Sequence, residues 1–224
     1  AATELALKQP GNLGLCYTYN EPLIQFEYVL DCSKLVREAG LCNVLVSNGY
    51  INPKPLAELI PFIDAINVDI KSLDEGYYNR LCGGKLKPVQ RAITELVKAK
   101  VHVELTNLLV TGQNDSDDQI KRLVDWVASL SKDIPLHFSR YFPQYQMDLP
   151  ATPEERLDKA YELGRARLNY VYLGNVLSSL GSNTHCAQCG NLLIVREGYS
   201  TRLVGLQGAA CGKCGALLAG RFEE

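Results

Sequence analysis

The sequence lacks the features that mark membrane proteins and nucleic-acid-binding proteins. No run of residues approaches the roughly 18 apolar residues that a membrane-spanning helix needs. The first residues do not show the basic and then apolar segments of a secretion signal. The formal net charge is only -2, so the charge balance suggests neither a nucleic-acid partner nor an acidic membrane surface. We therefore expect a cytoplasmic protein.

A disulfide framework is also missing. Of the eight cysteines, four form two Cys-x-x-Cys pairs near the C-terminus and four are scattered: Cys16, Cys32, Cys42 and Cys82. Scattered cysteines beside paired ones are typical of reduced thiols and a metal site, whereas disulfide frameworks belong to short secreted chains. The scattered cysteines are most simply small apolar residues, with a reactive thiol at Cys82 as the less favoured reading.

What the chain does contain is enough apolar sequence for one full core and a small additional unit. Its 224 residues are 46% hydrophobic and 21% charged. Strand-like segments alternate with helix-like ones, which predicts an α/β fold with a parallel sheet. Helix starts are indicated at Asp115-Ser116 and by a capping box at Thr152-Pro153-Glu154-Glu155. The predicted strands cover residues 13–19, 43–47, 65–71, 101–110, 136–141 and 170–173.

Polar and apolar residues alternate along three of these strands. In the segment 65–71, Asn67, Asp69 and Lys71 share one face, opposite an apolar face. The same alternation places His102, Glu104 and Thr106 together, and likewise His137, Ser139 and Tyr141. Because burying unpaired charges is costly, polar faces indicate a solvated or ligand-filled interior. A barrel lined by polar residues is favoured over an open sheet with exposed strand faces.

Short motifs follow several of the predicted strands in a fixed order. They are YTYNEP at residues 17–22, SNGY at 47–50, NVDIK at 67–71 and VTG at 110–112. This ordered set resembles the radical S-adenosylmethionine (SAM) superfamily, in particular the activating enzymes of glycyl-radical enzymes and the AmmeMemoRadiSam-system radical SAM proteins. The resemblance covers nearly the whole chain. It implies a partial (βα)6-type TIM-like barrel that lacks its first repeat.

The resemblance also implies a set of SAM-binding residues. Members of the family carry Gly-Gly-Glu where this chain has Tyr19-Asn20-Glu21, so Asn20 and Glu21 correspond to the residues that receive the SAM amino group. The other implied contacts are Ser47, Asn48, Asp69 and Lys71, with the lysine approaching the SAM carboxylate. Phe142 and Val46 stand where several activating enzymes have a histidine and an aspartate, so the adenosine and cation contacts differ in detail.

One family motif does not occur in the sequence. Radical SAM proteins hold a [4Fe–4S] cluster through Cys-x3-Cys-x2-Cys, and no cysteines here have that spacing. The resemblance places the motif before Ala1, and the chain begins within a βα repeat. We therefore expect an N-terminally truncated chain that does not assemble the cluster by itself and has no catalytic residue of its own.

The paired cysteines predict a second metal site by their own spacing. One pair is Cys186 and Cys189, and the other is Cys211 and Cys214. A glycine follows each pair directly. Two such knuckles supply the four thiolates that structural zinc prefers, with rubredoxin-like iron as the alternative. His185 is more simply a surface residue than a ligand. We expect a barrel domain over residues 1–178 and a zinc-ribbon-like knuckle over residues 184–220.

The function implied by the resemblance is reductive cleavage of SAM to a 5′-deoxyadenosyl radical that abstracts hydrogen from an unknown substrate. The implied partners are a one-electron reductant such as flavodoxin or ferredoxin, and a protein substrate if the protein resembles the activating enzymes. Two alternatives stay open. One is a barrel that binds SAM or a nucleotide without redox chemistry. The other is an interaction module whose knuckle contacts RNA or a protein, although basic residues there are sparse.

Overall fold

The computed structural model describes residues 2–220 and 222, which divide into two compact units. The first unit comprises the chain up to Ile70 together with Tyr78–Leu105, and the second comprises Lys71–Tyr77 together with the chain from Thr106 onward. A six-stranded sheet has its strands in the order β1 to β6, as they follow one another in the sequence. β1 pairs with β2, β2 with β3 and β5 with β6 in parallel. The predicted α/β class with a parallel sheet is confirmed.

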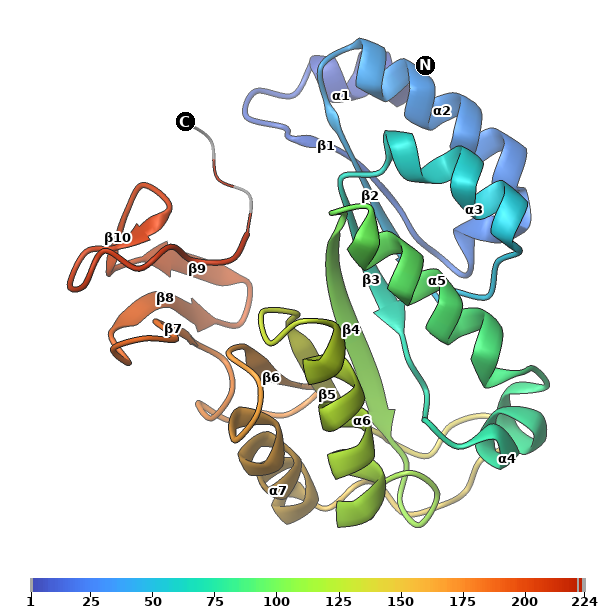
Figure 1. Ribbon diagram of the computed structural model, residues 1–224, viewed down its shortest axis with the longest axis vertical. Coiled ribbons are helices and arrows are strands. Elements are labelled where there is room, and N and C mark those ends of the chain that lie inside the picture. Colours follow the sequence, from blue (N-terminus) through green and yellow to red (C-terminus); the bar gives the residue numbers. More distant parts are fainter. Residues whose placement is uncertain (1, 221, 223–224) are drawn as a thin grey trace. The chain divides into compact units, whose positions relative to one another are not determined.

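The first unit alternates strands with helices. Figure 1 shows α2 and α3 side by side, with α2 along β2. The helices are α1 (Ala2–Leu7), α2 (Phe26–Glu38), α3 (Pro53–Leu59) and α5 (Leu86–Lys98), with shorter turns at Pro22–Gln25, Ile60–Phe62 and Tyr78–Cys82. The strands are β1 (Gly14–Tyr17), β2 (Cys42–Ser47), β3 (Ala65–Asp69) and the first half of β4 (His102–Leu109).

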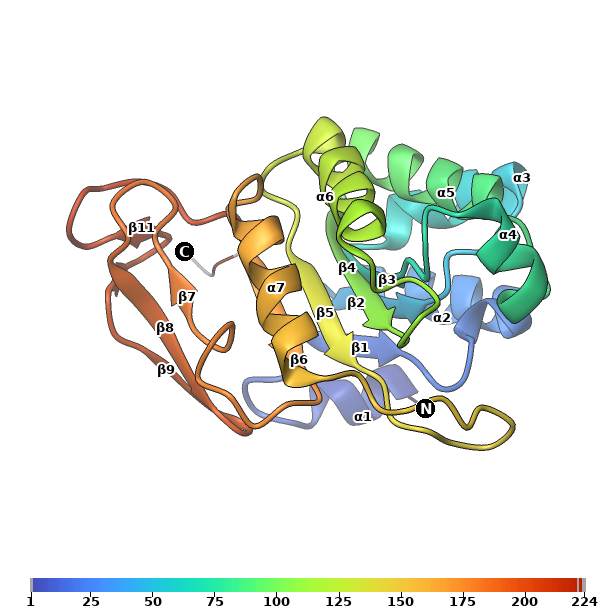
Figure 2. The ribbon, with the colours of Figure 1, turned by 90° about the horizontal axis from the view of Figure 1, so that it is seen from below.

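The second unit contains the remaining elements of the sheet and two small antiparallel sheets. Figure 2 shows α7 lying along β5 and β6. Its elements are α4 (Glu75–Tyr77), α6 (Asp117–Leu130), β5 (Leu136–Arg140), α7 (Glu154–Arg165), β6 (Val171–Gly174), β7 (Thr184–His185), β8 (Leu192–Glu197), β9 (Ser200–Leu203), β10 (Leu206–Gln207) and β11 (Ala210–Cys211). No helix in the described part of the chain combines the length and the apolar character needed to cross a membrane.

The predicted start of α6 is confirmed, but that of α7 is wrong in its detail. Ser116 and Gln119 form a reciprocal capping box at α6. Thr152 does not cap α7, which begins after Pro153 without a side-chain hydrogen bond at its N-terminus. Instead, the Thr152 hydroxyl donates to the Leu109 carbonyl at 2.5 Å and accepts from the Tyr141 N–H at 3.0 Å. The Thr152 hydroxyl is therefore bound to the Leu109 carbonyl at the end of β4 and to the Tyr141 N–H after β5, and it does not cap the helix.

The predicted alternation of strand faces is present in the first unit. Ile66 and Val68 of β3 are buried, while Asn67 and Asp69 are half-buried. Ile66 lines a small apolar cavity with residues of α3 and α5, so the apolar face of β3 meets the helices. Asn67 and Asp69 lie on the opposite face. In β4 the half-buried residues at positions 102, 104 and 106 likewise alternate with buried ones.

A buried amide in β2 connects β1, α2 and the turn before β3. Asn43 of β2 is fully buried, and its Nδ2 donates to the carbonyls of Ser33 at 2.9 Å and Phe62 at 3.0 Å. Its Oδ1 accepts from the Tyr17 hydroxyl at 2.9 Å. Its backbone N–H donates to the buried carboxylate of Asp64 at 2.8 Å. Asn43 thus links β1, β2, α2 and the start of β3.

We expect Asn43→Ala to lower the free energy of unfolding by about 2–4 kcal/mol, because it removes three hydrogen bonds inside a fully buried site. Chemical denaturation of the two chains measures the difference. Asn52→Ala is the matched control, since Asn52 is exposed and makes no capping bond at α3, and it should change stability by less than about 0.5 kcal/mol. Equal effects of the two substitutions would contradict the role given to Asn43.

Candidate functional site

The carboxylate of Glu21 is the centre of a hydrogen-bonded cluster at the carboxyl ends of β1 and β2. One of its oxygens accepts from the Ser47 hydroxyl at 2.8 Å and from the Leu23 N–H at 3.1 Å. The other accepts from the Asn48 N–H at 2.7 Å. The structure therefore brings together three of the residues predicted to bind SAM. Asn20, directly before Glu21, is exposed.

Local sequence fixes the two loops that meet at this cluster. Pro22 begins a short 3-10 turn, and Glu21 caps it through the bond to Leu23. In the other loop, the buried Ser47 hydroxyl accepts from the Gly49 N–H at 3.0 Å. Gly49 has a φ of +69°, and a Cβ there would lie 2.7 Å from a methyl carbon of Val68. Only glycine fits this close approach.

The remaining predicted residues, Asp69 and Lys71, lie at and just beyond the end of β3. Asp69 is half-buried in the first unit, and Lys71 is the first residue of the second unit. The Lys71 carbonyl accepts from Asn107 Nδ2 at 3.1 Å and from Asn114 Nδ2 at 2.7 Å. Both asparagines are buried. These two amides fix the backbone from which the Lys71 side chain extends.

Sequence reasoning missed these two asparagines as supporting residues. Asn107 carries a weak signal, since the alternation along β4 places this amide on the same face as the apolar Leu105 and Leu109. Asn114 carries no such signal in the sequence, because an asparagine in a loop before a helix is common. In the structure its Oδ1 accepts from the Val110 N–H at 2.7 Å, so the whole amide serves the backbone.

The two positions where the sequence departs from the activating enzymes are partly exposed. Val46 of β2 is 37% exposed, and Phe142 after β5 is 50% exposed. The guanidinium carbon of Arg140 lies 5.0 Å from the centre of the Phe142 ring. Each position therefore presents apolar surface where the resemblance implies a polar side chain.

The four C-terminal cysteines converge on one point. Their sulfur atoms all lie within 4.8 Å of one another, and the pairs Cys186–Cys214 and Cys189–Cys211 are 3.6 and 3.7 Å apart. In the described part of the chain, no other group of three or more histidine, cysteine or acidic residues is arranged to hold a metal ion. The group suits a single ion, because a tetrahedron with metal–sulfur bonds of about 2.3 Å has edges of about 3.8 Å.

Backbone geometry prepares these thiols for a cation. Gly190 and Gly215 close the two knuckles in the left-handed conformation, with φ of +70° and +75°. Their N–H groups donate to the carbonyls of Cys186 and Cys211 at 2.9 and 2.8 Å. Burial raises the pKa of Cys211, but hydrogen bonds from the backbone of Cys214 and its neighbour outweigh burial and lower that pKa to about 6. A thiol with a lowered pKa is a better metal ligand. At Cys214 a backbone hydrogen bond lowers the pKa, but hydrogen bonds with the neighbouring thiols outweigh it and raise that pKa to about 12.

The scattered cysteines do not fit an iron–sulfur cluster. Cys16 and Cys82 are exposed, while Cys32 and Cys42 are half-buried. None of them belongs to a group of potential metal ligands among the described residues. The three-thiolate set of a radical SAM cluster is therefore not formed by the residues that the structure describes.

Comparison with known proteins identifies the family. The model of the radical SAM superfamily matches residues 2–127, which is more than half of the chain. The chain belongs to the radical SAM superfamily. An uncharacterized protein of Methanocaldococcus jannaschii is 39% identical over 207 residues, which cover 90% of this radical SAM chain and 61% of the relative.

Other relatives of this radical SAM chain are activating enzymes. The 4-hydroxyphenylacetate decarboxylase activating enzyme of Clostridium scatologenes is 23% identical over 76% of this chain and 57% of its own length. The chain thus spans less than two thirds of either relative. A crystal structure of a domain of pyruvate-formate lyase-activating enzyme from Bacteroides vulgatus has a TM-score of 0.63 at 18% identity, covering 72% of this chain and 99% of that one. This likeness supports the fold.

Proposed function

We propose that this radical SAM chain holds SAM at the carboxyl ends of its strands in an enzyme that cleaves SAM reductively and abstracts hydrogen from a protein substrate. The observation that carries the proposal is the Glu21 cluster, which joins Ser47 and Asn48 at one rim. Family membership supports SAM as the cofactor. The relatives named as activating enzymes support a protein as the substrate.

The Glu21 cluster fits the amino group of SAM. A carboxylate has about four acceptor sites, and three are used by Leu23, Ser47 and Asn48. One acceptor site is left for an ammonium hydrogen, in a charge-assisted bond. The three protein donors hold the carboxylate in one orientation, so binding the ammonium costs little further ordering. Asn20 lies beside it on the exposed side.

Lys71 and Asp69 are the proposed partners of the rest of the amino-acid part of SAM. Lys71 supplies a positive charge for the SAM carboxylate, and Asn107 and Asn114 hold its backbone in place. Val46 contributes apolar surface at the rim, which keeps water from the reacting atoms. The bound cofactor supplies the 5′-deoxyadenosyl group that becomes the hydrogen-abstracting radical.

The ligands of the iron–sulfur cluster are proposed to lie on a segment that precedes residue 1, together with the first barrel repeat. This proposal rests on the mismatch between the cysteines of the chain and the cluster motif, and on the greater length of the relatives. A small electron-transfer protein such as flavodoxin or ferredoxin is the proposed electron donor. The chain of residues 1–224 is then expected to retain a SAM pocket without redox activity.

In a longer chain that includes the cluster motif, Glu21→Ala and Lys71→Ala should each weaken SAM binding roughly 10- to 100-fold. Each removes a hydrogen bond to a charged group, worth about 1.5–3 kcal/mol. Calorimetric titration with SAM under anaerobic conditions measures the loss. Glu58→Ala is the matched control, since Glu58 is an exposed residue of α3, and it should leave the affinity unchanged.

Two results would contradict the proposal in different ways. If residues 1–224 alone cleave SAM after anaerobic reconstitution with iron and sulfide, the cluster ligands lie within this chain. If the longer chain carries a cluster but leaves SAM intact, the enzyme is not a radical SAM catalyst and the SAM-binding alternative holds.

We further propose that Cys186, Cys189, Cys211 and Cys214 hold one zinc ion in a closed, structural site. The short distances between their sulfur atoms and the absence of a non-cysteine ligand in the set favour this assignment. Three strands of the knuckle, β7, β10 and β11, have only two residues each, so we expect their folding to depend on the ion.

Metal analysis of the purified chain should give about one zinc per chain, and Cys189→Ser should lose most of it. Cys32→Ser is the matched control and should retain the metal, because Cys32 is a residue of α2 that does not belong to the four-cysteine group. Unchanged zinc in Cys189→Ser would refute the site. Iron in place of zinc, with the absorption of a thiolate complex, would support the rubredoxin-like alternative.

A further inference from the structure

The two faces of β6 have different partners. On one face Val171 meets α7, since a Cβ added at Gly164 of α7 would lie 3.0 Å from both γ-carbons of Val171. Side chains alternate along a strand, so Tyr172 lies on the face opposite Val171, and Tyr170 directly precedes the strand. Both tyrosines line a small cavity together with Tyr161 and Arg165 of α7 and with Thr184 of β7, so the segment after β6 supplies part of their surroundings.

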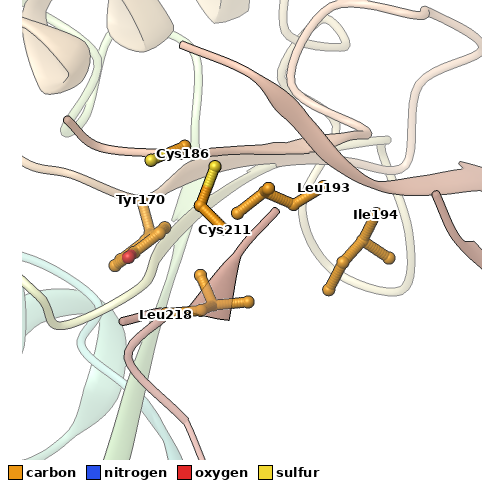
Figure 3. Close-up of a cluster of buried hydrophobic side chains, with 6 residues drawn as sticks. All are labelled: Tyr170, Cys186, Leu193, Ile194, Cys211 and Leu218. Carbon is orange, nitrogen blue, oxygen red and sulfur yellow. The ribbon is translucent and has the colours of Figure 1, made fainter. Parts of the chain in front are cut away.

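The four-cysteine knuckle covers the first of these tyrosines. Tyr170 is 5% exposed and belongs to one buried cluster with the metal-site residues Cys186 and Cys211 (Figure 3). Leu193, Ile194 and Leu218 complete this cluster. The Tyr170 hydroxyl also accepts from the Ala219 N–H at 3.5 Å. The core of the knuckle thus includes a side chain of the residue that precedes β6.

Two polar residues of the knuckle hold the second tyrosine. The Tyr172 hydroxyl lies 2.8 Å from Oγ1 of Thr184, which is two residues before Cys186. Arg196 of β8 donates to the same Thr184 oxygen at 2.8 Å. Its guanidinium carbon lies 5.4 Å from the centre of the Tyr172 ring, within the range of a cation–π contact. Tyr172 is therefore held through its hydroxyl and through its ring.

Tyr172 also stacks on His137. The two rings are 5.1 Å apart with an interplanar angle of 27°, and the residues are register partners across β5 and β6. His137 alternates with the buried Leu136 and Phe138, so it lies on the polar face of β5. Contacts run without a gap from the cysteine knuckle through Arg196 and Tyr172 to this histidine.

We propose that the metal knuckle is a wall of the sheet face that carries His137, and that Thr184 and Arg196 are positioning residues for the Tyr172–His137 stack. Binding of the metal orders β7 and β8, and these strands place Thr184 and Arg196 against Tyr172. Binding or loss of the metal therefore changes the surroundings of the His137 ring, although His137 is not a metal ligand. The further statement that His137 faces the substrate rests on the proposed function.

Histidine ring signals in NMR spectra provide the test, because the chain has only three histidines. In the zinc-loaded chain, removal of zinc by a chelator should shift the ring signals of His137. His185 is next to Cys186 and is the internal positive control, which must change when the metal leaves. His102 lies in β4 beside Glu104 and is the negative control, which should stay in place. Substitution of each histidine by glutamine assigns the three signals.

Variants with zinc still bound separate the contact from a general loss of structure. Arg196→Gln should shift the His137 ring signal. Arg196→Lys keeps the positive charge, so its His137 signal should lie close to that of the unsubstituted chain. Arg202→Gln is the matched control, since Arg202 is an exposed residue of the next strand that pairs with Glu197 at 3.5 Å. Zinc content is measured for every variant, and any variant that loses zinc counts as a repeat of the chelation experiment.

The proposal is overturned if the His137 signal is unchanged both by chelation and by Arg196→Gln while the His185 signal responds to chelation. This test uses neither SAM nor an iron–sulfur cluster. Its failure would therefore leave the proposed radical SAM function untouched, and failure of SAM binding would not alter its outcome.

Discussion

Backbone N–H and C=O groups at the ends of parallel strands lose the hydrogen-bond partners that a neighbouring strand would supply. In this chain, the side chains of Asn43, Asn114 and Thr152 supply hydrogen bonds to such groups. Asn43 of β2 binds the carbonyl of Phe62 in the turn before β3, and it also binds the carbonyl of Ser33 in α2. At the other end of the strands, Asn114 binds Val110 and Lys71, and Thr152 binds Leu109 and Tyr141. Because an unpaired buried backbone group costs about as much as a lost hydrogen bond, these side chains determine where each strand stops.

Glu21 extends the same device to the candidate site. Its carboxylate satisfies the N–H groups of Leu23 and Asn48 and so joins two loops. The residue proposed to bind the SAM ammonium is thus also part of the rigid frame. Positioning on strand ends suits a cofactor that must be held in one orientation, since loops fixed by several hydrogen bonds lose little entropy on binding. Loss of Glu21 removes a ligand contact and a loop contact together.

The sequence was sufficient to predict features that depend on local spacing. Alternation in β3 placed Ile66 and Val68 on one face and Asp69 on the other, because the period of two is a property of the strand itself. The cysteine spacing predicted the four-sulfur group for the same reason. Six strand segments and the cap at Ser116 were predicted correctly.

Features that depend on distant partners could not be predicted. Thr152 matched a capping box by spacing, but two open backbone groups from β4 and β5 compete for its hydroxyl. Asn43 resembled an ordinary strand residue, and nothing near it in the sequence reveals the carbonyl of Phe62 or the hydroxyl of Tyr17. An amide or hydroxyl in the sequence shows that a hydrogen bond is needed but not which group supplies it.

The same distinction explains how the knuckle is attached to the sheet. β6 is the last strand of its sheet, and the alternation Tyr170, Val171, Tyr172 predicts two aromatic rings on one face. Leaving two such rings in water would forgo about 1.5–3 kcal/mol each, so some element must cover them. The covering element is a segment too short to fold on apolar burial alone, and its own core includes Tyr170. Sheet edge and four-cysteine knuckle therefore complete each other, since the tyrosines extend the small core and the proposed ion would fix the strands that cover them.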